Sequence, residues 1–436
     1  MNASGAASVI VRPVGAIDAR PRIPGSKSIT NRALLLAAIA TGPSAVAGWL
    51  DAEDTRWMLG ALRALGIAVE GDAQSSTPLA LVGSGGPLRA SQAPLLQVGT
   101  AGTVARFVLA VLAGSPGTFT IDGSPRMRER PMGSLVAALR EQGASITSLG
   151  VADALPLRSG PNPERLRGGE IRLSRPVSSQ FVSGLAFSAL LADTPTHIVL
   201  EQGTPARPYV DMTLAMIRSW GGDASWSTHD TIVVVPGGLV GRHYVVEPDA
   251  SAASYFLALA AIRGGRCVIA ALGADSLQGD AGFAHVLGRM GARVSQDANT
   301  TIVEGDGRLR GGVFDLSDMP DMTLTLAVAA LSAVGDTRIE GVGILRHHES
   351  DRLAAVACEL RKFGATVVVD HDALTISPPA HPPTSRVAVD TYDDHRMAMA
   401  FGLAGDVEIR APQCVRKTFP GYFDELRALG VVVDQA

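Results

Sequence analysis

The sequence has no large excess of either positive or negative charge, and it has few aromatic side chains. Its 436 residues include 38 basic and 42 acidic side chains, and Phe, Trp and Tyr together make up 5%. A balanced charge gives no reason to expect nucleic acid or a membrane surface as a partner. So few aromatic side chains also argue against platforms on which nucleic-acid bases would stack.

Cysteine is scarce too, and long apolar segments are missing. The three cysteines, Cys267, Cys358 and Cys414, are scattered without CxxC spacing, which argues against a disulfide scaffold and a zinc cage and indicates a reducing compartment. The first 11 residues lack the basic start and apolar run of a secretory signal. Uncharged stretches such as Ala250–Ile262 and Met322–Gly335 are shorter than the roughly 20 residues of a membrane-spanning helix. We therefore expect a soluble cytoplasmic protein of about two domains.

Lysine is the rarest charged residue. Of the 38 basic side chains only Lys27, Lys362 and Lys417 are lysine, a bias that arginine-rich codon usage explains. Where a lysine remains, the site can require a compact, rotatable point charge. Lys362 is typical of a solvated helix end, whereas Lys27 and Lys417 lie within the motifs described below.

One pattern recurs six times along the chain. An apolar-periodic helix ends in Leu-Arg-like residues, a glycine follows, and a Val/Ile-rich stretch comes next; the glycines are Gly66, Gly143, Gly221, Gly291, Gly364 and Gly430. Glycine after a helix is typical of a left-handed cap, and the stretch after it of a strand. The pattern predicts an α/β fold of six units, three in each of two domains, with a boundary near Gly237–Pro248.

Several segments place small or cationic residues before apolar helices. PGSKSITNR at 24–32 combines a Gly/Ser turn with Lys27, Ser28 and Arg32, which suits an anion site at a helix N-terminus as well as an ordinary capped helix start. GTAGTVAR at 99–106, RMRERP at 126–131 and SSQF at 178–181 also precede predicted helices. Each taken alone is equally typical of a tight turn, a solvated helix start or a helix cap.

Two further segments combine acids with bases. RHHESDR at 346–352 lacks the HExxH spacing of a zinc site, because Arg352 stands where the second histidine is needed. Glu349 among cations instead suits proton transfer beside a bound anion. YDDHRM at 392–397 and Lys417 complete the set, and each could be a surface ion network. Taken together, at least four segments with cations at predicted helix N-termini indicate a substrate with several negative charges.

These motifs, in this order, resemble the 5-enolpyruvylshikimate-3-phosphate synthase family. PGSKSxTNR, GTAGTxxR, PRMRERP, SSQF, HESDR, DDHRMAM and KTFPxYF all match, from about Pro24 to Leu426. The resemblance implies two globular domains, each of three pseudo-symmetric βαβαββ units whose helix N-termini converge on an interdomain cleft. It also implies that residues 1–25 and 247–436 form one discontinuous domain and that residues 26–246 form the other.

The resemblance implies a reaction without cofactor or metal. The enolpyruvyl group of phosphoenolpyruvate is transferred to the 5-hydroxyl of shikimate 3-phosphate by addition and elimination. Glu349 would protonate the methylene carbon with help from Lys27, and Asp321 would deprotonate the hydroxyl. The residues implied for phosphoenolpyruvate are Lys27, Gly102, Arg126, Gln180, Arg352, Arg396 and Lys417. Those implied for shikimate 3-phosphate are Lys27, Ser28, Arg32, Ser178, Ser179, Gln180, Tyr209, Asp321, Ile344 and His348.

The sequence departs from the family's usual pattern in the predicted site. Ala206 replaces a serine, and Ile344 stands where asparagine is common. His348 replaces a lysine, so a fixed positive charge is replaced by an imidazole that we expect to titrate near neutrality. By the same resemblance, Gly102 lacks a methyl group that would exclude the inhibitor glyphosate, which favours sensitivity. Thr100 and Phe107 stand where asparagine and proline are common, and a shift of this helix by Phe107 would act in the opposite direction.

Two other functions fit parts of the pattern. UDP-N-acetylglucosamine enolpyruvyl transferase shares the implied fold and chemistry, but its usual form has a cysteine where residues 99–131 have none. A non-catalytic anion-binding protein would not need Glu349 and Asp321 together. We expect the shikimate enzyme, acting as a monomer on small molecules, without a nucleic-acid or membrane partner.

Overall fold

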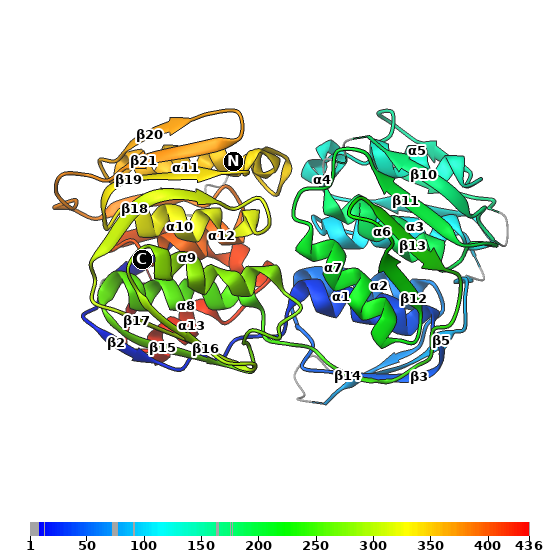
Figure 1. Ribbon diagram of the computed structural model, residues 1–436, viewed down its shortest axis with the longest axis horizontal. Helices are drawn as coiled ribbons and strands as arrows, with labels where there is room; N and C mark the ends of the chain where they lie inside the picture. Colours follow the sequence, from blue (N-terminus) through cyan, green and yellow to red (C-terminus); the bar gives the residue numbers. More distant parts are fainter. Residues whose placement is uncertain are drawn as a thin grey trace, which may run out of the picture. The chain divides into compact units, whose positions relative to one another are not determined.

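A computed structural model describes residues 8–12, 14–71, 77–89, 92–162, 165–174, 176 and 178–435. The chain divides into two compact units. Unit 1 comprises Met1–Pro24 and Glu247–Ala436, and unit 2 comprises Gly25–Val246. Within the described residues, each unit contains three four-stranded sheets and the helices that pack on them (Figure 1).

All six sheets have the same topology. An edge strand is parallel to the second strand, which is antiparallel to the third, and the third is antiparallel to the strand at the other edge. The sheets of unit 1 are β2 (Ile17–Ala19), β15 (Gly265–Ala270), β17 (Thr300–Gly305), β16 (Arg293–Gln296); β18 (Leu309–Asp315), β19 (Ala333–Glu340), β21 (Ala373–Ser377), β20 (Thr366–Val369); and β22 (Val387–Asp390), β23 (Val407–Arg410), β1 (Ser8–Arg12), β24 (Val432–Gln435).

Unit 2 repeats this arrangement. Its sheets are β14 (His243–Val245), β3 (Thr41–Ala47), β5 (Leu79–Ser84), β4 (Val69–Glu70); β6 (Leu95–Gln97), β7 (Phe119–Asp122), β9 (Leu157–Ser159), β8 (Ile146–Ser148); and β10 (Gly169–Leu173), β11 (Thr196–Leu200), β13 (Thr231–Val235), β12 (Asp223–Trp226). Three sheets are completed by strands distant in sequence: β14 pairs with β3, β2 with β15, and β1 with both β23 and β24. The six predicted α/β repeats are therefore confirmed.

Helices of two kinds connect the strands. The inner helices are almost completely buried: α8 (Ala250–Arg263), α10 (Thr323–Ala330) and α12 (His395–Phe401) in unit 1, and α1 (Lys27–Ile39), α3 (Gly102–Ala113) and α6 (Ser179–Ala189) in unit 2. The other helices are α9 (Phe283–Arg289), α11 (Arg352–Lys362) and α13 (Tyr422–Ala428), and α2 (Glu53–Ala64), α4 (Pro125–Glu129), α5 (Gly133–Glu141) and α7 (Pro208–Ser219). Four 3₁₀ turns lie in unit 1: η1 (Gly279–Gly282), η2 (Pro320–Met322), η3 (Gly343–His347) and η4 (Pro412–Lys417).

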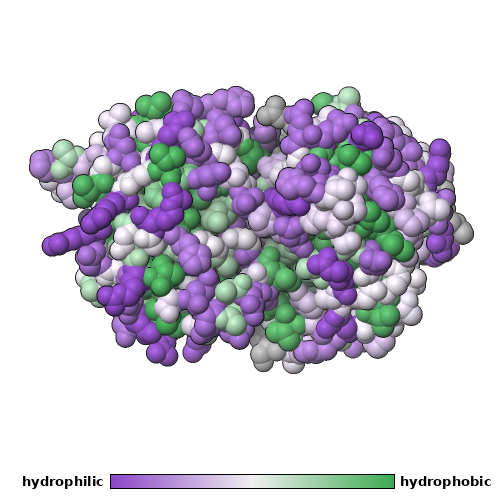
Figure 2. Space-filling model, in the orientation of Figure 1, coloured by the Kyte–Doolittle hydropathy of each residue, from purple (hydrophilic) through white to green (hydrophobic). Residues whose placement is uncertain are grey.

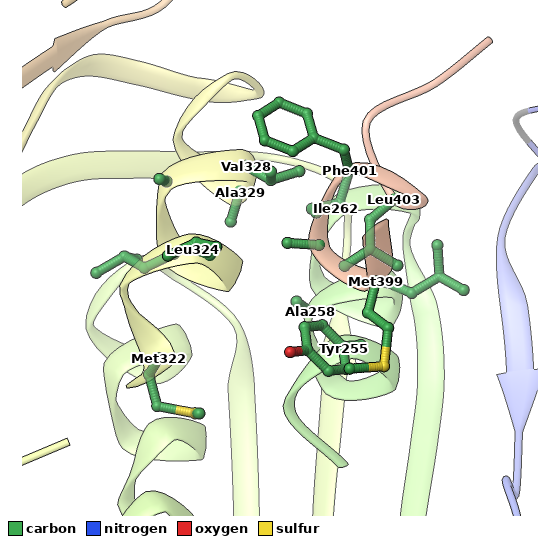
Figure 3. Packing of buried hydrophobic residues seen from close by; sticks show 14 of the residues in the cluster. Tyr255, Ala258, Ile262, Met322, Leu324, Val328, Ala329, Met399, Phe401 and Leu403 are labelled. Atoms are coloured by element: carbon green, nitrogen blue, oxygen red, sulfur yellow. The ribbon is translucent and has the colours of Figure 1, made fainter. Parts of the chain in front are cut away.

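The core of unit 1 lies between its three inner helices. Figure 3 shows Tyr255 and Ala258 of α8 near Leu324 and Val328 of α10, with Met399 of α12 alongside. Helices surrounded by other elements need apolar residues on every face, which explains why these segments have no polar stripe. In α10 and α12 the polar residues lie in the N-terminal half of the helix.

The glycine after each outer helix ends that helix as predicted. The six repeat glycines have φ between 81° and 113°, a left-handed conformation that other residues adopt at a cost. Each is followed by the edge strand that runs antiparallel to its neighbour in the sheet, such as β4 after Gly66. The chain therefore turns from the helix into the sheet within a few residues. The N-terminus of the helix lies at the end opposite this turn.

The surface is mixed in polarity. On the face shown in Figure 2, hydrophobic residues are scattered among hydrophilic ones, as is normal for exposed side chains. Within the part of the chain that the structure describes, every helix falls short of the length and hydrophobicity that crossing a membrane requires.

Candidate active site

The start of α1 brings a lysine next to a buried acid in unit 2. Ser26 caps the helix, and its hydroxyl accepts from the backbone N–H of Ile29. Lys27 follows, with its Nζ 3.4 Å from Oδ2 of Asp54 in the first turn of α2. The Lys27 side chain is 15% exposed and that of Asp54 only 3%. The ammonium group is thus held at the positive end of a helix dipole, where an anion would bind.

One turn further along α1, Arg32 is completely buried. Its guanidinium donates to Thr213 Oγ1 at 2.7 Å, to the carbonyl oxygen of Ser28 at 2.9 Å and to that of Tyr209 at 3.1 Å. The ring of Phe107 lies 5.0 Å from its Cζ. Burial lowers the pKa of Arg32 to about 10. The group remains charged at neutral pH, and the acceptors named here are neutral, so an anionic ligand would be strongly favoured there.

Two arginines surround the start of α3. A Cβ built at Gly102 would lie 2.7 Å from Nη1 of Arg106 and 3.0 Å from both Nη atoms of Arg130. Arg106 also donates to Oε1 of Gln180 at 2.6 Å, and Arg130 to the carbonyl oxygen of Thr100 at 3.1 Å. Both guanidiniums are buried. Glycine at 102 therefore lets two guanidiniums lie against the N-terminus of α3.

The N-termini of α6 and α7 supply neutral polar groups. The hydroxyl of Ser178 caps α6 by accepting from the backbone N–H of Gln180 at 3.2 Å, and Ser179 follows in the first turn. Tyr209 lies in the first turn of α7, and its carbonyl oxygen accepts from Arg32 and from Thr213. These groups and those around Gly102 belong to the same unit, and all lie at or near helix starts.

In unit 1, Arg352 at the start of α11 is the centre of an ion network. Its guanidinium is 1% exposed and donates to Asp321 Oδ1 at 2.7 Å, to Glu349 Oε2 at 2.9 Å and to Asp394 Oδ2 at 2.7 Å. Burial alone would lower the pKa of Arg352, but the charges of Asp394, Glu349 and Asp321 raise it above its ordinary value. The arrangement holds three carboxylates around one permanent cation.

Two more cations complete this network. Arg396 in the first turn of α12 donates to Asp321 Oδ2 at 2.7 Å, and Lys417 Nζ lies 3.3 Å from Glu349 Oε1. Burial would raise the pKa of Asp321, yet Arg396, His348 and Arg352 hold it well below its usual range. Asp321 is therefore ionised at neutral pH. Glu349, with one oxygen on Arg352 and the other near Lys417, is the second carboxylate available for proton transfer.

The surroundings of His348 lower its pKa from the ordinary value. Its Nδ1 lies 3.0 Å from Nη1 of Arg352 and 3.6 Å from Oδ1 of Asp321. Burial is the largest influence and lowers its pKa, and the Arg352 charge acts in the same direction. The imidazole is neutral at pH 7, so no positive charge is present there.

The chain matches known proteins over nearly its whole length. The family model described as EPSP synthase (3-phosphoshikimate 1-carboxyvinyltransferase) matches residues 11–426. A 3-phosphoshikimate 1-carboxyvinyltransferase of Photobacterium profundum is 42% identical over 429 residues, covering 97% of this chain and 99% of that protein. One of a Sulfurovum species is 40% identical, with the same coverage. The chain belongs to the EPSP synthase family.

Solved structures agree with this membership. An EPSP synthase from Acinetobacter baumannii superimposes with a TM-score of 0.82 at 26% identity, covering 99% of this chain and 100% of that one. An enolpyruvyl transferase from Streptomyces tendae, 18% identical with a TM-score of 0.79 and 99% coverage of both chains, shares the fold.

The structure places the predicted site residues of this EPSP synthase family member in two groups, one in each unit. Unit 2 holds Lys27, Ser28, Arg32, Gly102, Ser178, Ser179, Gln180 and Tyr209, and unit 1 holds Asp321, Ile344, His348, Glu349, Arg352, Arg396 and Lys417. In unit 1, Asp321, His348, Glu349, Arg352, Arg396 and Lys417 form one connected set. Ile344 lies in η3, four residues before His348.

Two residues of these groups were not selected by sequence reasoning. Arg126, predicted from the RMRERP motif, pairs with Glu129 and its side chain is 35% exposed, and its binding role stays a prediction. Arg130, four residues later and buried, is the arginine of this motif that lies beside Gly102. Asp394 was also missed, although its carboxylate binds Arg352 and caps α12. No local signal separates Arg126 from Arg130, because both are arginines near a helix end.

Proposed function

We propose that the two groups of residues bind and transform the substrates of the reaction that family membership assigns to this chain. The chain transfers the enolpyruvyl group of phosphoenolpyruvate to shikimate 3-phosphate and releases phosphate. The observation that best supports the roles below is the network in unit 1, in which two carboxylates with different surroundings share one buried arginine.

Asp321 and Glu349 take opposite roles in proton transfer. Asp321, ionised and held by two arginines, accepts the proton of the 5-hydroxyl of shikimate 3-phosphate. Glu349 gives a proton to the methylene carbon of phosphoenolpyruvate, while the hydroxyl oxygen bonds to C2 and forms a tetrahedral adduct. Loss of phosphate, together with a proton from the new methyl group, restores the double bond.

The substrate's negative charges prepare Glu349 for this step. In the structure Arg352 and Lys417 both face the Glu349 carboxylate. An opposite charge nearby favours the ionised form of a carboxyl group. When a substrate carboxylate or phosphate takes over these two cations, the carboxyl group loses that influence, which favours the protonated acid the reaction needs.

The remaining cations hold the ligands. Arg352 and Arg396 bind the phosphoenolpyruvate carboxylate, whose plane matches the guanidinium fork. Lys27, Arg126, Gln180, Lys417 and the backbone at Gly102 bind its phosphate, and we add Arg130 because it lies beside Gly102. Arg32, Ser28, Ser178, Ser179 and Tyr209 bind shikimate 3-phosphate.

Phosphate release, with each acceptor offered separately, tests this assignment. We expect release from phosphoenolpyruvate with shikimate 3-phosphate and none with UDP-N-acetylglucosamine. Glu349→Gln removes the proton donor at constant shape, and we expect at least a 10²-fold loss of kcat, the lower end for a general acid. Glu340→Gln is the matched control, because that glutamate pairs with Arg338 at the surface. Release with the sugar nucleotide alone would overturn the acceptor assignment.

We also infer that the enzyme works as a monomer in the cytoplasm. The free thiols Cys267, Cys358 and Cys414 support a reducing compartment. Light scattering of the purified protein near 45 kDa would support the monomer, and a mass of about twice that value would contradict it.

A further inference from the structure

A buried carboxyl group, Asp280, is linked to Arg396 by a single serine. Asp280 lies on η1 and is 3% exposed. The hydroxyl of Ser251, in the first turn of α8, donates to its Oδ2. Nη2 of Arg396 in turn donates to Ser251 Oγ at 3.2 Å and to Asp321 Oδ2 at 2.7 Å. Three separate elements therefore meet in the order Asp280, Ser251, Arg396.

The charge state of Asp280 decides which way the serine hydroxyl points. An ionised carboxylate only accepts hydrogen bonds, so Ser251 must direct its proton to Asp280 and its lone pairs to Arg396. A protonated carboxylic acid can itself donate, which leaves the serine hydroxyl free to turn. The ionised acid thus keeps an acceptor aimed at one nitrogen of Arg396.

We propose that Asp280 is a positioning residue that, through Ser251, holds Arg396 in the orientation that receives the phosphoenolpyruvate carboxylate. This inference rests on the role assigned to Arg396 above. Arg396 has its Nη2 shared between Ser251 and Asp321, so its guanidinium plane is set by two acceptors. Losing one of them lets the guanidinium rotate and weakens its hold on a planar ligand.

The surroundings of Asp280 bring its pKa into a pH range in which the enzyme can be assayed. The charged groups that act on it are Asp321 of η2, Arg396 of α12 and Asp249, which caps α8. Burial and the negative charge of Asp321 raise the pKa of Asp280 to about 6. The carboxyl group is ionised at pH 7.5 and mostly protonated at pH 5.0, so the positioning effect is present at the higher pH and lost at the lower.

Steady-state kinetics of Asp280→Asn, compared with wild type at pH 7.5 and pH 5.0, test the inference. Loss of one oriented hydrogen bond is worth about 1 kcal/mol, so we expect the KM for phosphoenolpyruvate to rise about fivefold at pH 7.5. At pH 5.0 the ratio of variant to wild type is expected to fall towards one, because the wild-type acid is then protonated as well. Titration of the substrate cancels in this ratio.

Further variants separate positioning from a general structural effect. Ser251→Ala removes the link, so we expect a similar rise at pH 7.5, and the double variant should be no worse than Ser251→Ala alone. The KM for shikimate 3-phosphate and kcat are expected to stay within about twofold, as for any group that affects only one ligand's binding. Asp275→Asn, at an exposed acid in the same loop, is the control and should match wild type.

Each outcome of these measurements either supports or overturns the positioning role of Asp280. A ratio that is equal at both pH values, additive effects in the double variant, or losses shared by both substrates would overturn the positioning role. Arg396→Lys is measured in parallel. If Arg396→Lys raises the KM for phosphoenolpyruvate while Asp280→Asn does not, the inference fails and the assignment of Arg396 stands. If Arg396→Lys leaves that KM unchanged, the assignment of Arg396 itself is wrong.

Discussion

Replacing Arg352 by methionine tests whether unit 1 depends on one buried cation. Arg352 is 1% exposed and contacts Asp321, Glu349 and Asp394, of which Asp394 is completely buried. Removing one partner from a buried ion cluster leaves uncompensated charge and costs about 3–5 kcal/mol. We therefore expect Arg352→Met to lower the free energy of unfolding of unit 1 by about that amount at pH 7.5.

The pH dependence of this loss has a definite sign. In the wild type the pKa of Asp321 is depressed, so its stabilisation is present above the unfolded value and is lost as the pH falls through the folded one. Without Arg352 the buried carboxyl groups take up protons in the folded state at a pH where the unfolded chain does not. Protonation relieves the repulsion, so the deficit should shrink between pH 7.5 and pH 5.

Urea unfolding followed by circular dichroism measures the effect. For a slope of about 2.5–3 kcal/mol per molar urea, the expected loss moves the midpoint down by about 1–2 M at pH 7.5. Arg293→Met is the matched control, because Arg293 is 84% exposed in its pair with Glu304 and such pairs contribute about 0–1 kcal/mol. Equal midpoint shifts in the two variants, or a deficit that grows as the pH falls, would refute the reasoning.

Two further predictions concern the binding of phosphoenolpyruvate in unit 2. Arg130→Met removes a buried charged donor beside Gly102 and should raise the KM for phosphoenolpyruvate about 10- to 100-fold. Initial rates with varied phosphoenolpyruvate measure this, and a change of less than about threefold would contradict it. Gly102→Ala adds a methyl 2.7 Å from Arg106 Nη1, and overpacking of about 1–3 kcal/mol predicts a KM for phosphoenolpyruvate raised about tenfold with that for shikimate 3-phosphate little changed. Equal effects on both KM values would contradict this.

Local sequence patterns predicted the repeats and the ends of their helices. Each repeat glycine follows a helix by a few residues, and its positive φ is a requirement that the backbone imposes locally. The cations at the N-termini of α1 and α12 follow from the same short-range logic, because a capping residue and a helix start are encoded within four or five positions. The resemblance to the family added the roles expected of Glu349 and Asp321.

Only the tertiary structure distinguished residues that look alike in sequence. Arg126 and Arg130 share one motif, yet one pairs at the surface and the other is buried beside Gly102. His348 follows a pattern that suggests titration near neutrality, but burial lowers its pKa. Burial depends on what packs over a side chain, and that comes from other segments of the chain.

The ion network around Arg352 also depends on contacts that only the tertiary structure shows. Arg352 and Asp394 are 42 residues apart, and Asp280, Ser251 and Arg396 come from three elements joined only by the fold. The sequence by itself determined which charged residues stand at helix starts, since helix formation and capping act over a few neighbouring residues. The structure decided which charges meet and which are shielded from water, because electrostatic energies depend on distance and burial, and packing brings distant segments together.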